Sequence, residues 1–233
     1  VGLNEITVKA ADAEGNIATK TIYVRLKLPK AEQPYDIGIF YFSNWNPDLS
    51  PHMVVNTRQT YGTEDWFHGI REHLLGPGLW SYGPIPDREP LLGWYDDRNR
   101  GILDQHILQA ASRGIDHFAF YYYWKEDGSA PRPGQNVEYW KDSPYKDLME
   151  YFLVFIADGS FGPAHWQNNI VPKLIEFMKD PTYKRTNIPA GVLADHPELA
   201  DLNDRPILGF FGDVKSRLGG TDESVKENLN YLR

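Results

Sequence analysis

Four short, almost uninterrupted apolar segments recur along residues 36–233, and they restrict the fold more than any other feature of this sequence. They occupy residues 37–42, 115–124, 151–157 and 206–211. Segments of this length, rich in aromatic and β-branched residues, predict strands that are covered on both faces, as in parallel sheets. Helical periodicity follows at 98–113, 166–179 and 222–232, and a weaker helical signal lies at 143–149.

This alternation predicts an α/β fold with a parallel sheet and right-handed crossovers. Two architectures fit this alternation: a doubly wound open sheet, or the first half of a (β/α)8 TIM-type barrel. Each βα unit averages roughly 50 residues, which suits a barrel with long loops. The segment after the first strand, YFSNWNP at 41–47, is aromatic and polar rather than glycine-rich. It therefore disfavours a nucleotide-binding sheet.

Residues 1–27 have a different pattern, with period-two alternation at 6–10 and 19–26 around a turn at Gly15 and Asn16. Alternation around such a turn predicts a β-hairpin. An isolated hairpin is marginally stable, so we expect this one to belong to a larger sheet. It resembles the last two strands of a bacterial immunoglobulin-like β-sandwich module; the alternative is a hairpin packed on the next domain. The expected organisation is this module at 1–27, a linker at 28–35 and the α/β domain at 36–233.

Composition excludes several classes of function. The chain has no cysteine, so disulfides, zinc–thiolate sites and cysteine nucleophiles are absent. A formal net charge of −8 argues against nucleic acid and anionic membranes as partners. No apolar segment is long enough for membrane insertion. No residue pattern calls for a metal or a cofactor, and we expect neither.

The predicted strand ends carry side chains suited to carbohydrate. Sugars present apolar CH faces and hydroxyl groups, so their sites combine aromatic rings with carboxylates, amides and lysine. Tyr123 and Trp124 cannot both face such a site, because side chains alternate along a strand, and we favour Trp124 as nearer the rim. The predicted substrate-binding residues are Tyr41, Asn44, Trp45, Trp124, Lys125 and Asp158. The long segment 46–97 adds Trp66, Trp80, Tyr82, Trp94 and Tyr95, either as groove walls or as loop core.

Two acidic residues are candidates for catalysis. Asp158 and Asp213 end consecutive predicted strands, and paired strands would bring them within the roughly 5–5.5 Å used by retaining glycosidases. Acids after strands also commonly cap the next helix. By the same argument, Asp96 and Asp97 form an N-cap region for the following helix. His117, inside a strand, reads as a hydrogen-bonded core histidine.

Residues 93–97 (GWYDD), the helix after them and residues 114–124 (GIDHFAFYYYW) resemble the glycoside hydrolase family 99-like proteins. These include WbsX-type proteins linked to bacterial surface polysaccharides. FMKDPTY at 177–183 and RPIL at 205–208 are similar to the family's step into a strand. The resemblance implies a (β/α)8 barrel and retaining, endo-type hydrolysis of an α-mannoside-like linkage.

The family's two catalytic glutamates lie in an Asn-Glu-Trp-type motif on a late strand, and this sequence has no such motif. We therefore expect the acid pair beyond Arg233, with more polypeptide on both sides of the chain. The sequence also departs from the family pattern at 157–160 and by an insert at 188–204.

The expected function is a bacterial glycoside hydrolase acting on an α-mannoside-like or other bacterial or host polysaccharide. Immunoglobulin-like modules usually belong to exported proteins, so the expected location is extracellular or at the cell surface. Two alternatives stay open: a non-catalytic glycan-binding surface protein, and a polysaccharide-assembly protein of the WbsX type.

Overall fold

The four predicted strands form one parallel sheet. The computed structural model describes residues 3–25, 35–43, 45–49, 51–65, 67, 69, 71, 90–156 and 163–232. The strands are β3 (Gly38–Tyr41), β4 (His117–Tyr123), β5 (Glu150–Ile156) and β6 (Leu208–Phe211), in the order β3-β4-β5-β6. All three pairings are parallel, which confirms the prediction. The order never reverses among the described strands, whereas a doubly wound sheet requires a reversal.

The two faces of this sheet differ in burial. On one face, Phe118, Phe120 and Tyr122 of β4 lie in register with Tyr151, Leu153 and Phe155 of β5. All six are almost fully buried, and they form the main core with the helices. The opposite face carries a smaller cluster and several half-exposed rings. Its aromatic residues are Phe40, Phe42, Tyr121, Tyr123, Phe152 and Phe211.

Helix α3 (Arg100–Ser112) matches the helix predicted at 98–113. Its apolar face buries Leu103 and Ile107 against the sheet. The helix N-cap is Asn99, whose side chain accepts a hydrogen bond from the Gly101 N–H. The prediction that Asp96 and Asp97 form the N-cap region is therefore wrong, and Asp97 has another role described below.

The connection between β4 and β5 contains two 3-10 helices, η3 (Asn136–Asp142) and η4 (Lys146–Leu148). The helical signal at 143–149 corresponds only to the short η4. The residue that closes the core here is Trp140 of η3, which is fully buried. Its ring packs edge-on against Phe120, and its Nε1–H donates to Thr182 Oγ1 at 2.8 Å.

The helix predicted at 166–179 is three consecutive elements: α4 (Pro163–His165), the π-helical η5 (Trp166–Ile170) and α5 (Val171–Met178). Pro172 lies in the first turn of α5, directly after the π-helical η5. A proline lacks the N–H that continues a helix, and the first turn is where that loss is tolerated.

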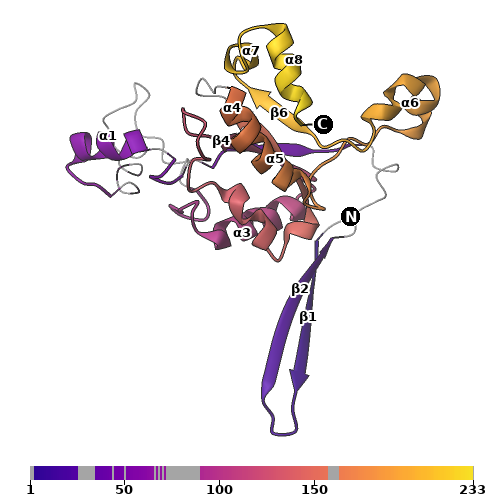
Figure 1. Ribbon diagram of the computed structural model, residues 1–233. Coiled ribbons are helices and arrows are strands. Elements are labelled where there is room, and N and C mark those ends of the chain that lie inside the picture. The colour runs from indigo at the N-terminus through magenta and orange to yellow at the C-terminus, as the bar shows by residue number, and fades with distance from the viewer. Residues whose placement is uncertain are drawn as a thin grey trace.

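Further helices lie in the connections that lead to β4 and β6, and after β6. Helix α8 (Asp222–Asn230) matches the helix predicted at 222–232. It begins at a capping box formed by Thr221 and Ser224. Helix α7 (Val214–Arg217) precedes it. The insert at 188–204 folds as α6 (Ala190–Asp195) and η6 (Pro197–Leu202), which stand apart from the sheet (Figure 1). Helix α1 (Pro51–Tyr61) lies in the long segment after β3.

The predicted hairpin is confirmed as β1 (Leu3–Ala11) and β2 (Ile17–Arg25), paired antiparallel in full register. The Asp12 carboxylate accepts hydrogen bonds from the Glu14 and Asn16 N–H groups, and Gly15 takes a φ of 86°. The hairpin projects away from the α/β body (Figure 1). Its membership of an immunoglobulin-like module stays a prediction, and most of the linker lies outside the described residues.

The hairpin joins the body at the amino end of the sheet. The Arg25 guanidinium donates to the Ile115 and Leu148 carbonyls and pairs with Asp116 at 3.1 Å. Tyr23 packs edge-on against Tyr145. Only 4% of the Arg25 side chain is exposed. The base of the hairpin is therefore part of the packed domain.

Further ion pairs surround this end of the sheet. The Lys184 Nζ lies 2.5 Å from Asp36 Oδ2 and 3.2 Å from Glu150 Oε2. His117 Nδ1 lies 3.0 Å from Asp36 Oδ1, as expected of a hydrogen-bonded core histidine. Its ring covers Gly38, where a Cβ would meet His117 Nε2 at 2.0 Å. Within the described residues, no helix is long and apolar enough to cross a membrane.

Candidate functional site

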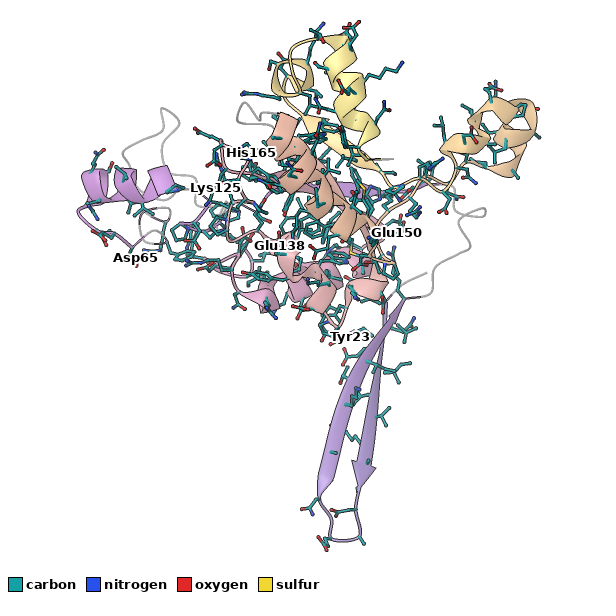
Figure 2. All side chains as sticks on the ribbon, viewed as in Figure 1. Tyr23, Asp65, Lys125, Glu138, Glu150 and His165 are labelled. Atoms are coloured by element: carbon teal, nitrogen blue, oxygen red, sulfur yellow. The ribbon has the colours of Figure 1, made fainter. Side chains whose placement is uncertain are left out.

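A pocket of about 150 Å³ lies at the carboxyl end of β3. In parallel α/β folds this end of the sheet is where ligands bind. Figure 2 shows that the carboxyl and amino ends of the sheet lie on opposite sides of the body. Lys125, which follows β4, marks the carboxyl end, and Glu150, which begins β5, marks the amino end. The pocket is lined by Phe40, Tyr41, Phe42, Tyr95, Asp97 and His106.

Asp97 joins the two segments that form the pocket wall. Its Oδ2 accepts the Trp45 N–H at 2.8 Å, and its own N–H donates to the Trp45 carbonyl at 3.2 Å. The chain after β3 is thereby fixed to the turn before α3. The Trp45 ring packs against Trp94 and Tyr95, so this clamp also orders an aromatic cluster beside the pocket.

The Asp97 carboxyl is almost fully buried, with 1% exposure. Burial raises its pKa to about 6, and the nearby Asp96 carboxylate adds to the increase. Hydrogen bonds from Trp45 and Asn136 oppose this increase but do not cancel it. The same environment raises the pKa of Tyr95 to about 12, through burial and the Asp97 charge. A carboxyl that titrates near neutrality beside a pocket is a feature of functional sites.

A chain of buried hydrogen bonds leads from Asp97 to the helix α3. The Asn136 Nδ2 lies 3.3 Å from Asp97 Oδ1 and 2.8 Å from the Tyr41 hydroxyl. The Tyr41 hydroxyl lies 2.6 Å from His106 Nδ1. Burial lowers the pKa of His106, so its imidazole is neutral at neutral pH. Four side chains from separate parts of the chain thus form one polar network behind the pocket.

Two buried polar atoms near this network make no hydrogen bond to any residue that the structure describes: the Asn136 Oδ1 and the Trp94 Nε1. A buried donor or acceptor without a partner costs roughly 1–3 kcal/mol. Unpaired groups of this kind are rare in stable cores and often mark functional sites. Their position therefore supports a binding role for this end of the sheet.

The structure brings together two of the predicted binding residues, Tyr41 and Trp45, through Asp97 and Asn136. The choice of Trp124 over Tyr123 is wrong. Trp124 shares the helix-covered face with Tyr122 and is 2% exposed, so its indole has no free face for a sugar. Tyr123 is the ring on the open face. Every residue in this strand is apolar or aromatic, so the alternation gave no sign of which face is covered.

The remaining predicted residues have other placements. Lys125 is exposed beyond the end of β4. Asp213 is exposed and caps α7, with its carboxylate accepting the Ser216 N–H at 3.2 Å. This hydrogen bond is the main reason that its pKa lies below the usual value. Asn44 and Asp158 lie outside the described residues, so the Asp158–Asp213 pair stays a prediction.

Sequence reasoning missed Asp97, Asn136 and His106 as site residues. Asp97 follows another acid before a helix, which is typical of a cap. His106 occurs on a helix face among apolar residues, and Asn136 follows a glycine-containing loop. The GWYDD segment was the one available signal, because its turn contributes both Tyr95 and Asp97 to the pocket.

No metal centre is found among the described residues: none of them forms a group of three or more His, Asp or Glu side chains suited to hold an ion. Comparisons with protein-family models, with curated proteins and with solved structures found no match for this chain. The site's geometry is therefore the basis for any functional conclusion.

Proposed function

We propose that this chain belongs to a carbohydrate-active enzyme, a glycoside hydrolase that binds sugar at the carboxyl end of its parallel sheet. The observation that carries the proposal is the pocket itself, where aromatic rings and a buried carboxyl that titrates near neutrality meet. An α-mannoside-like polysaccharide is the proposed substrate, on the sequence resemblance. The proposed location is extracellular or at the cell surface, because the hairpin resembles part of an immunoglobulin-like module of the kind found in exported proteins.

The proposed architecture is a (β/α)8 barrel, with residues 36–233 as its first four βα units. The sequential strand order supports this proposal, because right-handed crossovers then leave from one face of the sheet. The opposite face supports it as well. Its half-exposed rings, such as Phe40 and Phe211, are the kind of side chain that fills a barrel interior.

The pocket's groups match the surface of a sugar ring. Phe42 is 49% exposed and offers an apolar ring face to CH groups. The Tyr95 hydroxyl and the His106 imidazole offer hydrogen bonds to sugar hydroxyls. Glycosidases need one carboxyl group with a raised pKa as general acid. Asp97 has the raised pKa, but N–H donors contact both of its oxygens, so we assign it a positioning role.

One observation favours a second candidate, a non-catalytic glycan-binding protein. Two described carboxyl groups at this end are engaged in structure: Asp213 caps α7, and Asp97 clamps Trp45. A binder needs the aromatic pocket but no acid pair. The two candidates share the site and differ only in whether a bound sugar is hydrolysed.

The test is isothermal titration of the full-length protein with α-mannan oligosaccharides, alongside an assay of reducing ends released from α-mannan. Phe42→Ala should weaken binding about tenfold, which is about 1.4 kcal/mol, because the stacking ring is lost. Tyr35→Ala is the matched control. Tyr35 is an exposed aromatic residue just before β3, at the amino end of the sheet, and its loss should leave binding unchanged.

Binding with release of reducing ends supports the hydrolase. Binding without hydrolysis supports the glycan binder. If the folded Phe42→Ala variant binds as the parent does, the pocket is not the sugar site. If the parent binds none of the oligosaccharides, the proposed substrate is wrong.

A further inference from the structure

The hydrogen-bonded network behind the pocket ends at the His106 imidazole, which lines the pocket. His106 Nδ1 is engaged by the Tyr41 hydroxyl. His106 Nε2 makes no hydrogen bond within the described part of the chain, although the imidazole lines the pocket. Which of the two nitrogens carries the proton decides whether Nε2 is a donor or an acceptor toward a ligand.

With Asp97 ionised, the hydrogen bonds permit a single arrangement. A carboxylate only accepts, so the Asn136 amide must present its NH₂ group to Asp97 Oδ1. The same Nδ2 donates to the Tyr41 oxygen. The Tyr41 proton then has His106 Nδ1 as its acceptor. His106 therefore carries its proton on Nε2 and is a hydrogen-bond donor in the pocket.

With Asp97 protonated, the same positions support the reverse arrangement. The Asp97 hydroxyl donates to the Asn136 oxygen after the amide flips, and that oxygen also accepts the Tyr41 proton. The Tyr41 oxygen then accepts from His106 Nδ1–H, so Nε2 is left as an acceptor. One proton is taken up, at Asp97. The imidazole keeps one proton, since it releases the Nε2 proton to solvent and binds another at Nδ1.

We propose that Asp97, Asn136 and Tyr41 form a positioning chain that selects the tautomer of His106, the residue that contacts the ligand in this pocket. This inference deepens the proposed function and relies on its pocket as the ligand site. The ligand chemistry is a hydroxyl group, which both donates and accepts. His106 thereby offers a donor to the sugar when Asp97 is ionised and an acceptor when Asp97 is protonated.

The charges around Asp97 allow this titration at near-neutral pH. Burial raises its pKa to about 6, and Asp96 raises it further. Asp96 is itself held by the Arg98 guanidinium at 2.6 Å, which lowers the Asp96 pKa. In the described part of the chain, no lysine or arginine forms an ion pair with Asp97.

The surroundings of the other titratable groups that face Asp97 disfavour their charged forms. Burial and the Asp97 charge raise the pKa of Tyr41, on β3, and of Tyr95, on the turn. On α3, burial lowers the pKa of His106 and so disfavours the imidazolium form. Asn136, on η3, does not titrate. Burial raises the pKa of Asp97 to about 6, so its charge changes as the pH falls through that value.

The test is nitrogen NMR of the full chain with ¹⁵N-labelled histidine, from about pH 8 to about pH 5. His106→Gln assigns the His106 signals. In the parent, Nε2 should be the protonated nitrogen at high pH, and the two nitrogen signals should exchange character as Asp97 titrates. A direct change to imidazolium, with no tautomer exchange, would overturn the proposal.

Two variants test whether Asp97 and Tyr41 each control the tautomer of His106. Asp97→Asn presents an N–H donor to Asn136 at every pH, where protonated Asp97 presents an O–H donor. This variant should therefore lock His106 with its proton on Nδ1. Tyr41→Phe removes the connection and should abolish the exchange. The exposed His196 is the control and should be unchanged in both. If Asp97→Asn keeps the proton on Nε2, the proposal is wrong. These signals need no sugar, so failure of α-mannan binding would leave this result intact.

Discussion

The two ends of the parallel sheet handle buried polar groups in opposite ways. At the amino end, charges of opposite sign face each other. Arg25 pairs with Asp116, and Lys184 lies between Asp36 and Glu150. Removing one member of such a pair leaves the other charge buried, so these contacts are strongly coupled to folding.

At the carboxyl end, the described partners of the buried Asp97 are neutral donors, and the Asn136 Oδ1 and Trp94 Nε1 have no partner among the described residues. This end would be more stable if its polar groups were fully paired. Buried polar groups without partners occur where a site needs free donors and acceptors for a ligand. Under the proposed function, the amino end serves stability and the carboxyl end serves binding, which is the division of roles known from α/β barrels.

The largest loss of stability should follow a substitution at the amino end of the sheet. Arg25→Leu leaves the Asp116 carboxylate without its guanidinium and removes the donors to two carbonyls. We expect a loss of about 3–5 kcal/mol in the free energy of unfolding, measured by urea denaturation at neutral pH.

Arg58→Leu is the matched control for this substitution. Arg58 also pairs with an acid, Glu64, but both side chains are well exposed. Exposed pairs contribute little, so we expect a change below about 0.5 kcal/mol. Equal losses in the two variants would show that the amino end is not specially stabilised, and the contrast between the ends would fail.

The next largest effect is the pH dependence that Asp97 imposes. Its pKa is about 6 in the folded state and 3.8 by its ordinary value, so folding takes up a proton between these values. Its favourable contribution is present below pH 3.8 and is lost as the pH rises through about 6. Relative to the parent, Asp97→Asn should therefore gain up to about 3 kcal/mol in unfolding free energy between acidic pH and neutrality.

Asp36→Asn, at the amino end of the sheet, should change the pH dependence of the unfolding free energy in the opposite direction. Hydrogen bonding and attraction from Lys184 oppose the burial of Asp36 and hold its pKa below the ordinary value. Its contribution is present above that ordinary value and is lost as the pH falls. The variant should therefore lose stability relative to the parent as the pH rises. Slopes of the same sign in both variants would contradict the assignment of the two ends.

The smallest effect sharpens the comparison within the carboxyl end. Asn99 caps α3 there but does not line the pocket. Asn99→Ala should cost about 1 kcal/mol in urea denaturation, while Asn99→Gly costs only a few tenths. Sugar binding should be unchanged in both. A binding loss in Asn99→Ala would mean that the cap and the pocket are coupled.

The repeating elements of this fold could be predicted from the sequence. The strands of the sheet are short, almost uninterrupted apolar segments, and α3, α5 and α8 have clear helical periodicity, so local chemistry determines them. The 3-10 helix η3 could not be predicted, because seven residues are too few to show a helical period. Its fully buried Trp140 is recognised only through contacts with β4 and β5.

The candidate site was predicted only in part, for a related reason. Tyr41 and Trp45 lie next to a strand end, which sequence patterns identify. The role of Asp97 depends on Asn136, which is 39 positions away along the chain. A local pattern shows an acid before a helix, and only the folded arrangement shows that the acid points inward to a partner on η3.

The attachment of the hairpin has a mechanical consequence. Each of its strands has nine residues, so the tip lies about 30 Å from the base. A sideways force on the turn at Gly15 acts through this lever arm, and the torque converges on the contact between Arg25 and Asp116. Asp116 also accepts the Ile37 N–H at the start of β3, so tension passes from the hairpin into the first strand of the sheet. A force that pulls on the hairpin would therefore act first on the amino end of the sheet.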